Sequence, residues 1–332
     1  MSAPNRERLT REDLAWSADA LRAIGEVYSS RMVGQTGLRE TLLIGLLTGG
    51  HILLESVPGL AKTTAAQTLA QAVSGSFVRI QCTPDLLPSD IVGTQIYDAS
   101  KGAFETQLGP VHANIVLLDE INRSSAKTQS AMLEAMQEKQ TSIGGVTHRL
   151  PEPFLVLATQ NPIEQEGTYP LPEAQLDRFM FKDILEYPTP AEEAEILARI
   201  DAGIFEQGTT QNISLDAVRE LQKLTKRVYI DDAVIEYIVS LVFVTRNAHK
   251  YLPEKLARLV EVGASPRATI NFAAASRAAA LIQGRDHVIP EDVRQVSRRI
   301  LRHRVTLSFE AEAERIKPDQ IVDAIVAAVR TP

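Results

Sequence analysis

Two pairs of polar residues have the types and spacing of a site for a metal-bound nucleoside triphosphate. The first pair, Lys62 and Thr63, follows the apolar run Ile52–Leu54 and a tight turn at Pro58 and Gly59. A strand, a turn and a helix N-terminus in this order form an anion site, because unpaired backbone N–H groups and the helix dipole favour phosphate. In such a loop the lysine reaches the β and γ phosphates, and the next hydroxyl binds Mg²⁺.

This loop departs from the usual pattern Gly-x-x-x-x-Gly-Lys-Ser/Thr. Ser56 and Ala61 occupy the two glycine positions, and only Gly59 remains to let the backbone close on an anion. Taken alone, the segment favours nucleotide binding by roughly two to one over a plain strand-turn-helix unit. The residues that we expect to hold the nucleotide here are Pro58, Gly59, Leu60, Ala61, Lys62, Thr63 and Thr64.

The second pair, Asp119 and Glu120, follows the apolar run Ile115–Leu118. Such a run indicates a central parallel strand that is covered on both faces, and its carboxyl end lies where α/β sheets bind ligands. Asp119 is suited to hold Mg²⁺ through water, and Glu120 to polarise the water that attacks the γ phosphate. The alternative is a plain acidic loop after a buried strand. Once Lys62 and Thr63 are taken into account, the probability of this alternative is roughly one in ten. We therefore expect the two pairs to converge, from adjacent parallel strands, on one triphosphate.

Other polar residues follow predicted elements at places that suit the same site. The turn Val33, Gly34 and Gln35 precedes the first strand of the site and could cover an adenine ring. Asn161 follows the buried strand 154–159 and could orient the attacking water, although a turn asparagine before a proline is the alternative. Arg267 lies in the first turn of a helix that begins with Ser-Pro, which allows it to reach an anion. A plain surface arginine there has roughly even odds.

Composition sets the class of protein. The chain has 332 residues, of which 44% are hydrophobic, so about two packed domains are expected. A net charge of −7 argues against a protein that coats nucleic acid by bulk electrostatics. Cys82 is the only cysteine, which excludes an internal disulfide and favours a reducing compartment. Because no apolar run approaches transmembrane length and Met1–Glu12 is polar, we expect a cytoplasmic protein without membrane insertion.

The sequence also predicts two domains with different patterns of secondary structure. Strands and helices alternate over residues 1–187, interrupted by two hairpins, one over 94–107 and one over 141–149 with Gly144 and Gly145 at its turn. Beyond residue 190 the pattern is helical, apart from a strand-like alternation over Val305–Phe309. The predicted helices cover 190–201, 214–227, 231–249, 253–262, 266–283, 290–300 and 318–329. We therefore expect an α/β domain over 1–187 and a smaller all-α domain over 188–332.

Together these motifs resemble the MoxR group of AAA+ ATPases, in the clade that carries a hairpin inside helix 2. The resemblance covers nearly the whole chain, from Val33 to Arg304. It rests on the segments Pro58–Thr63, Thr83–Asp90, Leu118–Arg123, Thr128–Ser130, Ala158–Pro162, Glu166–Phe179 and Gly263–Ala268. Ala61 is usual in this group, whereas Ser56 replaces a glycine. A Cβ at that position crowds the loop, which puts the tightness of phosphate binding in question.

The resemblance implies a fold and a set of roles. The fold is a P-loop AAA+ core with a central parallel five-stranded sheet and β-hairpin insertions, followed by the smaller all-α lid domain. The cofactors are ATP and Mg²⁺. The implied roles are Walker A for Lys62 and Thr63, Walker B for Asp119 and Glu120, sensor 1 for Asn161, the arginine finger for Arg178 and sensor 2 for Arg267. Gln81 is a weaker candidate for a residue that restrains Glu120.

The resemblance further implies an ATP-hydrolysing chaperone that works as a homo-oligomer, a hexameric ring in which Arg178 completes the neighbouring site. Its partners would be a von Willebrand factor A-domain protein and a client protein complex, into which cofactors are inserted. Two alternatives stay open. One is a chelatase-like or DNA-helicase motor of the same clade, and the other is an ATP-binding assembly scaffold with little turnover.

Overall fold

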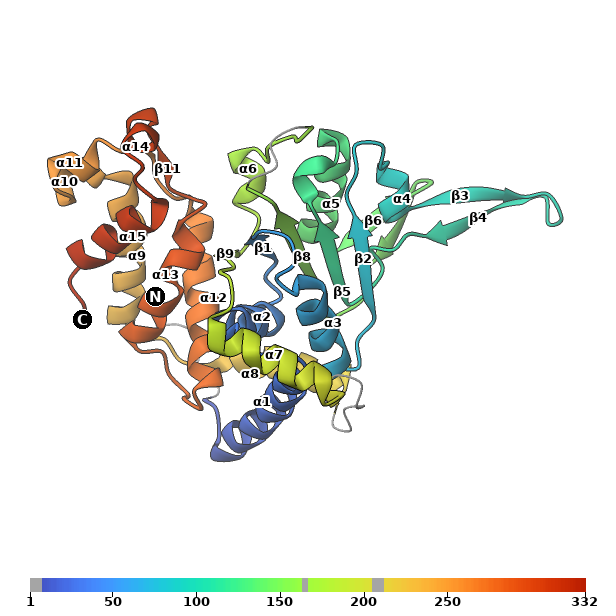
Figure 1. Ribbon diagram of the computed structural model, residues 1–332, viewed down its shortest axis with the longest axis horizontal. Helices are drawn as coiled ribbons and strands as arrows, with labels where there is room; N and C mark the ends of the chain where they lie inside the picture. Colours follow the sequence, from blue (N-terminus) through green and yellow to red (C-terminus); the bar gives the residue numbers. More distant parts are fainter. Residues whose placement is uncertain (1–7, 163–166, 205–211) are drawn as a thin grey trace. The chain divides into compact units, whose positions relative to one another are not determined.

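The computed structural model describes residues 8–162, 167–204 and 212–332, and Figure 1 labels its elements. The chain divides into two compact units. The α/β unit comprises Arg22–Arg178 and Asp183–Arg219. The helical unit comprises the chain up to Leu21, Phe179–Lys182 and Glu220–Pro332. The sequence-based boundary between 187 and 188 stays a prediction.

A five-stranded sheet forms the centre of the α/β unit and confirms the predicted fold class. Its strands are β1 (Ile52–Glu55), β2 (Phe77–Gln81), β5 (Ile115–Asp119), β8 (Leu155–Gln160) and β9 (Phe181–Ile184), in the order β2-β5-β8-β1-β9. The pairs β2–β5, β5–β8 and β1–β8 are parallel. All five residues of β5 are buried, as expected of a strand that is covered on both faces.

One expectation about the sheet is wrong. We expected β1 and β5, which lead to the two polar pairs, to be adjacent, but β8 lies between them. The reason is visible in β8 itself, because Leu155–Ala158 is buried throughout and therefore needs a central position with neighbours on both sides. The consequence is that Asn161, directly after β8, lies between the ends of the other two strands.

Nine helices, two of which match the predicted ranges 190–201 and 214–227, are described before residue 228. They are α1 (Arg11–Arg31), α2 (Thr36–Thr48), α3 (Lys62–Ala72), α4 (Pro88–Val92), η1 (Ile121–Arg123), α5 (Ala126–Glu138), α6 (Glu173–Leu176), α7 (Pro190–Asp201) and α8 (Leu215–Arg227). Helix α7 begins at a capping box. Thr189 Oγ1 accepts from Glu192 N at 3.3 Å, and the Glu192 carboxylate accepts from Thr189 N at 2.7 Å.

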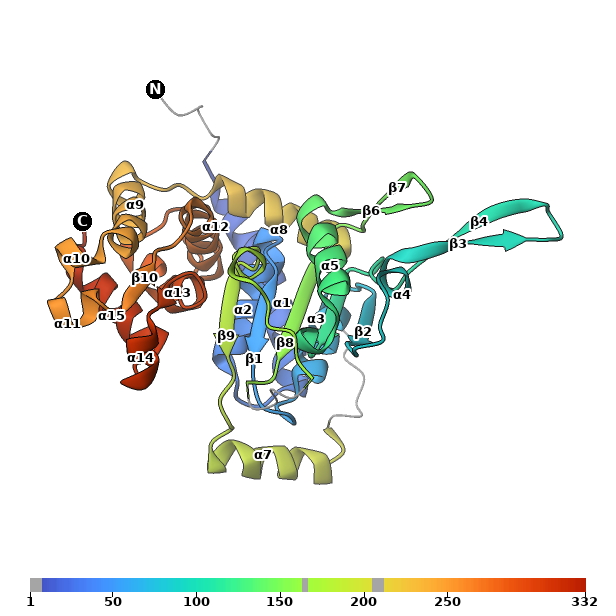
Figure 2. The same ribbon diagram turned by 90° about the horizontal axis from the view of Figure 1, so that it is seen from above.

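Both predicted hairpins are present. One consists of β3 (Gly93–Asp98) and β4 (Ala103–Leu108), and the other of β6 (Gln140–Ile143) and β7 (Val146–Arg149). Gly144 and Gly145, at the turn of the second hairpin, have φ values of +56° and +82°, which explains the need for glycine there. Figure 2 shows that the two hairpins project from the same side of the α/β unit.

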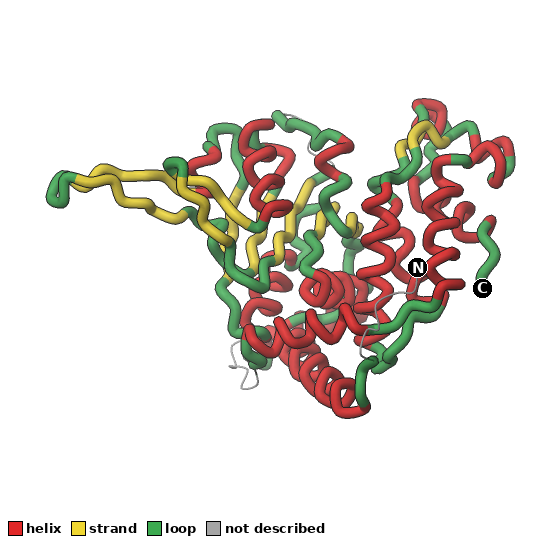
Figure 3. The backbone as a smooth tube through the Cα atoms, turned by 180° about the vertical axis from the view of Figure 1, so that it is seen from behind, coloured by secondary structure: helices red, strands yellow, loops and turns green. Residues whose placement is uncertain are grey.

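The helical unit contains more than helices (Figure 3). Its elements are α9 (Asp232–Arg246), α10 (Ala248–Tyr251), α11 (Glu254–Ala257), β10 (Val260–Val262), α12 (Pro266–Ile282), α13 (Pro290–Leu301), β11 (Thr306–Leu307), α14 (Phe309–Ala313) and α15 (Pro318–Ala328). The predicted helix over 253–262 is wrong beyond Ala257. Val260 and Val262 alternate with a glutamate, a strand pattern, and this segment pairs with β11. In the parts of the chain that the structure describes, no helix is both long and apolar enough to cross a bilayer.

His51, at the start of β1, makes the stability of the α/β unit depend on pH. It is buried, its Nδ1 accepts from Val156 N at 3.0 Å, and its Nε2 lies 3.1 Å from Met136 O. Burial lowers the pKa of His51 to about 4 in the folded protein, whereas the ordinary value is near 6.5. Between these two pH values His51 is therefore neutral in the folded protein and gains a proton when the protein unfolds.

We expect the free energy of unfolding to fall by about 2 kcal/mol between pH 7 and pH 5 because of His51 alone. Urea unfolding of the wild type and of His51→Gln at the two pH values measures this contribution. The stability should be full above the unfolded pKa near 6.5 and should decline toward pH 4, with a shallower decline in the variant. The same pH dependence in both proteins would contradict the assignment.

Candidate nucleotide-binding site

The loop between β1 and α3 has the geometry of an anion-binding turn. Gly59 and Ala61 have φ values of +85° and +53°, and Lys62 opens helix α3 directly afterwards. Ser56 is not among the described residues with positive φ, so its Cβ imposes no left-handed strain on the loop. Its hydroxyl donates to Val57 O at 3.1 Å, and its backbone N donates to Gln160 O at 3.2 Å. The loop therefore accommodates the serine that replaces the family's glycine.

The residues predicted to hold the phosphates line one cavity. Its volume is about 420 Å³. The lining residues are Pro58, Gly59, Leu60, Ala61, Lys62, Thr63, Arg79, Asp119, Glu120 and Asn161. The structure thus brings together both polar pairs and Asn161, which are spread over about a hundred residues of the sequence.

Asp119 is held in a fixed orientation by hydrogen bonds to both carboxylate oxygens. Thr159 Oγ1 donates to Oδ1 at 2.7 Å, while Arg79 Nε and Nη2 donate to Oδ2 at 3.1 and 2.6 Å. Burial would by itself raise the pKa of Asp119, but these hydrogen bonds and the positive charges of Arg79 and Lys62 lower it below its ordinary value. Asp119 is therefore an anion at neutral pH, as a metal ligand has to be.

Glu120 is oriented by its backbone and by two side chains. Its φ is +58°, an uncommon conformation for a residue with a Cβ, and its N–H donates to Thr159 Oγ1 at 2.9 Å. Its Oε2 accepts from Gln81 Nε2 at 3.2 Å and from Arg123 Nη1 at 3.0 Å. The suspected contact between Gln81 and Glu120 is thus present.

Lys62 lies half-buried between these charges. Burial lowers the pKa of its ammonium group, and the carboxylates of Asp119 and Glu120 oppose this effect. A phosphate anion in the cavity would favour the charged form further, because an opposite charge nearby stabilises it.

A second cavity of about 420 Å³ shares the loop Gly59, Leu60 and Ala61 with the first. The other lining residues are Arg31, Met32, Val33, Gln35, Thr64, Pro188, Ile196 and Ile200. This apolar cavity with few polar groups suits a flat ring such as adenine. Gly34 has a φ of +63°, and a Cβ on it would come within 2.1 Å of the Glu192 carboxylate. The predicted turn Val33–Gln35 therefore lies at this end of the site.

Several lining residues escaped the sequence analysis. Ile196 and Ile200 lie four residues apart on α7, a spacing that could have indicated an apolar face turned toward the site. Arg79 lies two residues before Gln81 on β2 and therefore faces the same side of the strand. No local pattern pointed to Met32 or Pro188, which reach the cavity only through the tertiary fold.

Two arginines with implied roles do not line either nucleotide cavity. Arg178 lines a separate cavity of about 260 Å³, together with Ser130, Glu134, Gln137, Glu138 and Gln175. It is not among the described residues that line either nucleotide cavity. Arg267 lies in the first turn of α12 in the helical unit, where its N–H donates to Ser265 Oγ at 3.1 Å. Glu166, in the motif before Arg178, lies outside the described residues.

The donor chemistry of the site suits Mg²⁺. Thr63 and Asp119 offer hard oxygen atoms, the ligands that Mg²⁺ prefers. Within the described ranges no three His, Cys, Asp or Glu side chains gather into a metal site of their own. Mg²⁺ commonly binds through one or two protein oxygens plus substrate phosphates, so the two observations agree.

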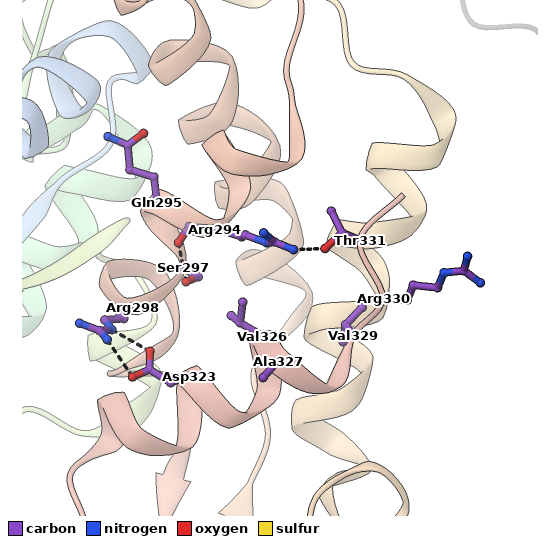
Figure 4. A pocket seen from close by; sticks show the side chains of 10 residues that line it. All are labelled: Arg294, Gln295, Ser297, Arg298, Asp323, Val326, Ala327, Val329, Arg330 and Thr331. Atoms are coloured by element: carbon purple, nitrogen blue, oxygen red, sulfur yellow. Dashed lines mark hydrogen bonds and ion pairs between the residues drawn. The ribbon is translucent and has the colours of Figure 1, made fainter.

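A further cavity of about 670 Å³ lies in the helical unit between α13 and α15. Three of its lining residues are arginines, but Figure 4 shows that their guanidinium groups do not converge. Arg298 pairs with both oxygens of Asp323 at 2.8 Å, Arg294 contacts Thr331, and Arg330 points away. The arrangement is therefore not that of an anion site.

Comparisons with known proteins agree with the geometry. Residues 51–181 match the ATPase family associated with various cellular activities (AAA), and residues 256–325 match the AAA lid domain. Chaperone MoxR1 of Mycobacterium tuberculosis is 49% identical over 311 residues, covering 94% of this chain and 82% of that protein. The protein YeaC of Bacillus subtilis is 44% identical, with 91% of each chain covered.

A solved crystal structure from Cytophaga hutchinsonii has a similar fold, with a TM-score of 0.91, 47% identity and 97% of each chain covered. The family match thus covers the strands and loops that line the phosphate cavity, and the relatives extend the likeness to nearly the whole chain. The protein belongs to the MoxR family of AAA+ ATPases.

Proposed function

We propose that the chain is an ATP-hydrolysing AAA+ chaperone that remodels client protein complexes. The observation that carries the proposal is the convergence of Lys62, Thr63, Asp119, Glu120 and Asn161 on one cavity. The adjoining apolar cavity gives the same site an end suited to adenine. ATP is therefore the proposed nucleotide, with Mg²⁺ as its metal.

Each residue of the phosphate cavity has a role that follows from its position. Lys62 binds the β and γ phosphates, and Thr63 and Asp119 hold Mg²⁺, which neutralises phosphate charge when it is bound. Glu120 polarises the attacking water, and Asn161 orients it from the end of β8. Gln81 and Arg123 both donate to Oε2 of Glu120 and thereby orient the carboxylate that polarises the water.

Arg178 acts on the site of a second copy. Because it lines a separate cavity in its own chain, a role in hydrolysis requires a neighbouring subunit. A finger given in trans implies a head-to-tail interface, and such interfaces close into rings. We propose a hexameric ring, with Arg267 reporting the nucleotide state from the first turn of α12.

The two hairpins form the proposed surface for the client or for a von Willebrand factor A-domain partner. Their bases are joined, because His112 Nε2 lies 3.0 Å from Thr141 Oγ1. Tyr97 and Phe104 face each other across β3 and β4 with ring centroids 5.3 Å apart, and both are more than half exposed. Exposed aromatic residues on a projecting element are typical of a protein-binding surface. The name of the relative Chaperone MoxR1 supports the same assignment.

Replacing Tyr97 and Phe104 by serine should reduce client or partner capture by about tenfold or more, because exposed aromatic anchors often carry most of the binding energy. The measurement is a pull-down under ATP with Glu120→Gln protein, which traps the bound state, with and without the two serines. Thr106→Ser on the same strand is the matched control. ATP turnover, measured in the protein with Glu120 intact, should stay unchanged. Undiminished capture by the double variant would refute the assignment of the hairpins.

We further propose that the chain works in the cytoplasm and, with a von Willebrand factor A-domain partner, inserts cofactors into its clients. Stimulation of ATP turnover by DNA would instead favour a helicase of the same clade. Phosphate release by the wild type and by Glu120→Gln distinguishes a motor from an assembly scaffold with little ATP turnover.

A further inference from the structure

The segment Phe179–Lys182 directly follows the proposed arginine finger, Arg178. It runs into strand β9, yet it groups with the helical unit rather than with the α/β unit that contains Arg178. Phe179 and Phe181 are fully buried. Strand β9 lies beside β1 in the central sheet, and three consecutive residues directly after α13 also contact the segment, namely Arg302, His303 and Arg304.

Arg304 makes the most extensive of these contacts. Its side chain is buried, with only 6% exposed, and its guanidinium group donates to three backbone carbonyls. Nη2 donates to Phe179 O, and Nη1 donates to Met180 O at 3.1 Å and to Ile300 O at 2.6 Å. Because a buried cation is costly unless its donors are satisfied, these carbonyls and Arg304 fix one another.

The two residues before Arg304 make further contacts with the backbone of the same segment. His303 is partly buried, the resulting desolvation keeps its pKa well below the ordinary value, and its Nε2 lies 3.2 Å from Phe179 O. A carbonyl only accepts, so His303 is the donor there. Arg302 Nη1 donates to Lys182 O at 3.3 Å, and its other donors pair with both oxygens of Asp319 at 2.9 and 2.8 Å. Three neighbouring side chains thus hold the carbonyls of Phe179, Met180 and Lys182.

We propose that Arg304, with Arg302 and His303, is a positioning device for Arg178 that ties the arginine finger to the helical unit. Consecutive Cα atoms lie about 3.8 Å apart, so a fixed Phe179 restricts where the backbone of Arg178 can lie. The start of β9 is anchored beside β1 in the central sheet, so the contacts of Arg304 with Phe179 and Met180 fix the short stretch that joins Arg178 to this strand. Loss of these contacts lets the stretch shift and therefore moves the finger. The inference rests on the proposed role of Arg178 in trans. The inference goes beyond that role because it names the residues that set the position of Arg178.

The test is the ATP turnover of Arg304→Met, which keeps the apolar stem and removes the donors. Displacement of a catalytic group by about 1 Å costs on the order of 10²-fold in rate, and we expect a loss of that size. The affinity for ATP should stay within about twofold of wild type, because the finger does not bind the nucleotide of its own chain. Arg298→Gln is the matched control, since Arg298 lies on α13, shortly before Arg304 in the chain, but pairs with Asp323. Its turnover should stay at the wild-type level.

Mixed rings separate a displaced finger from a damaged fold. Glu120→Gln subunits cannot hydrolyse ATP but carry an intact finger, while Arg304→Met subunits keep intact Walker residues. In equimolar random rings about one quarter of the sites combine an Arg304→Met active site with a Glu120→Gln finger. Phosphate release should therefore return to about one quarter of the wild-type level, as it should for Arg178→Ala mixed with Glu120→Gln.

Each result decides the proposal. Wild-type turnover by Arg304→Met alone would overturn it. So would recovery in the Arg178→Ala mixture without recovery in the Arg304→Met mixture, because the finger in trans would then stand while the positioning role failed. Failure of both mixtures would overturn the finger in trans itself and the inference with it. If Arg304→Met does not fold, Arg302→Gln, which removes the contact with Lys182 O together with the ion pair to Asp319, takes its place in the same comparison.

Discussion

Arg178→Ala will lower the turnover number for ATP by on the order of 10³-fold while leaving the affinity for ATP nearly unchanged. The arginine stabilises charge that develops on the γ phosphate only in the transition state, so its loss reduces the rate rather than ground-state binding. Because Arg178 lines a cavity separate from the nucleotide site of its own chain, the loss is expected only at sites that a neighbouring subunit completes.

Steady-state phosphate release, together with calorimetric titration of ATP, measures both quantities for Arg178→Ala. Arg298→Gln is again a suitable control, because it removes an arginine from an ion pair within the helical unit. Wild-type turnover in the alanine variant would contradict a finger role. A large loss of ATP affinity would show instead that Arg178 binds nucleotide directly.

The phosphate end of the site could be predicted because its signals are local. A strand, a turn and Lys62-Thr63 follow one another within fourteen residues of the chain. Their geometry is set by backbone sterics and by the helix N-terminus. The pair Asp119 and Glu120 likewise follows a fully buried strand, whose apolar run is readable without the fold. Parallel strands open at one edge of the sheet, so the convergence of the two pairs could be expected as well.

The rest depends on contacts between distant segments. The order of the strands could not be read from the chain, and β8 lies between two strands that we expected to be adjacent. Ile196 and Ile200 line the second cavity from a helix more than a hundred residues after the phosphate loop. The ion pair between Arg79 and Asp119 runs diagonally between neighbouring strands, because Gln81 and not Arg79 lies opposite Asp119, and no spacing in the sequence reveals it.

Glu120→Gln is the second substitution with a large expected effect. The amide cannot accept a proton from the attacking water, so turnover should fall by about 10²-fold or more. The side chain keeps its size and one oxygen, and the phosphate loop is untouched, so ATP binding should remain. Lys62→Ala is the matched contrast, because it removes the cation that contacts the phosphates and should weaken binding itself.

The most direct test of the account compares phosphate release and ATP binding in wild type and Glu120→Gln under the same conditions with Mg²⁺. The account predicts turnover by the wild type, its loss in the variant, and similar ATP affinity for both proteins. Equal rates in the two proteins would support a scaffold that binds ATP without hydrolysing it. Absence of ATP binding by the wild type would contradict the assignment of the cavity around Lys62 and Asp119.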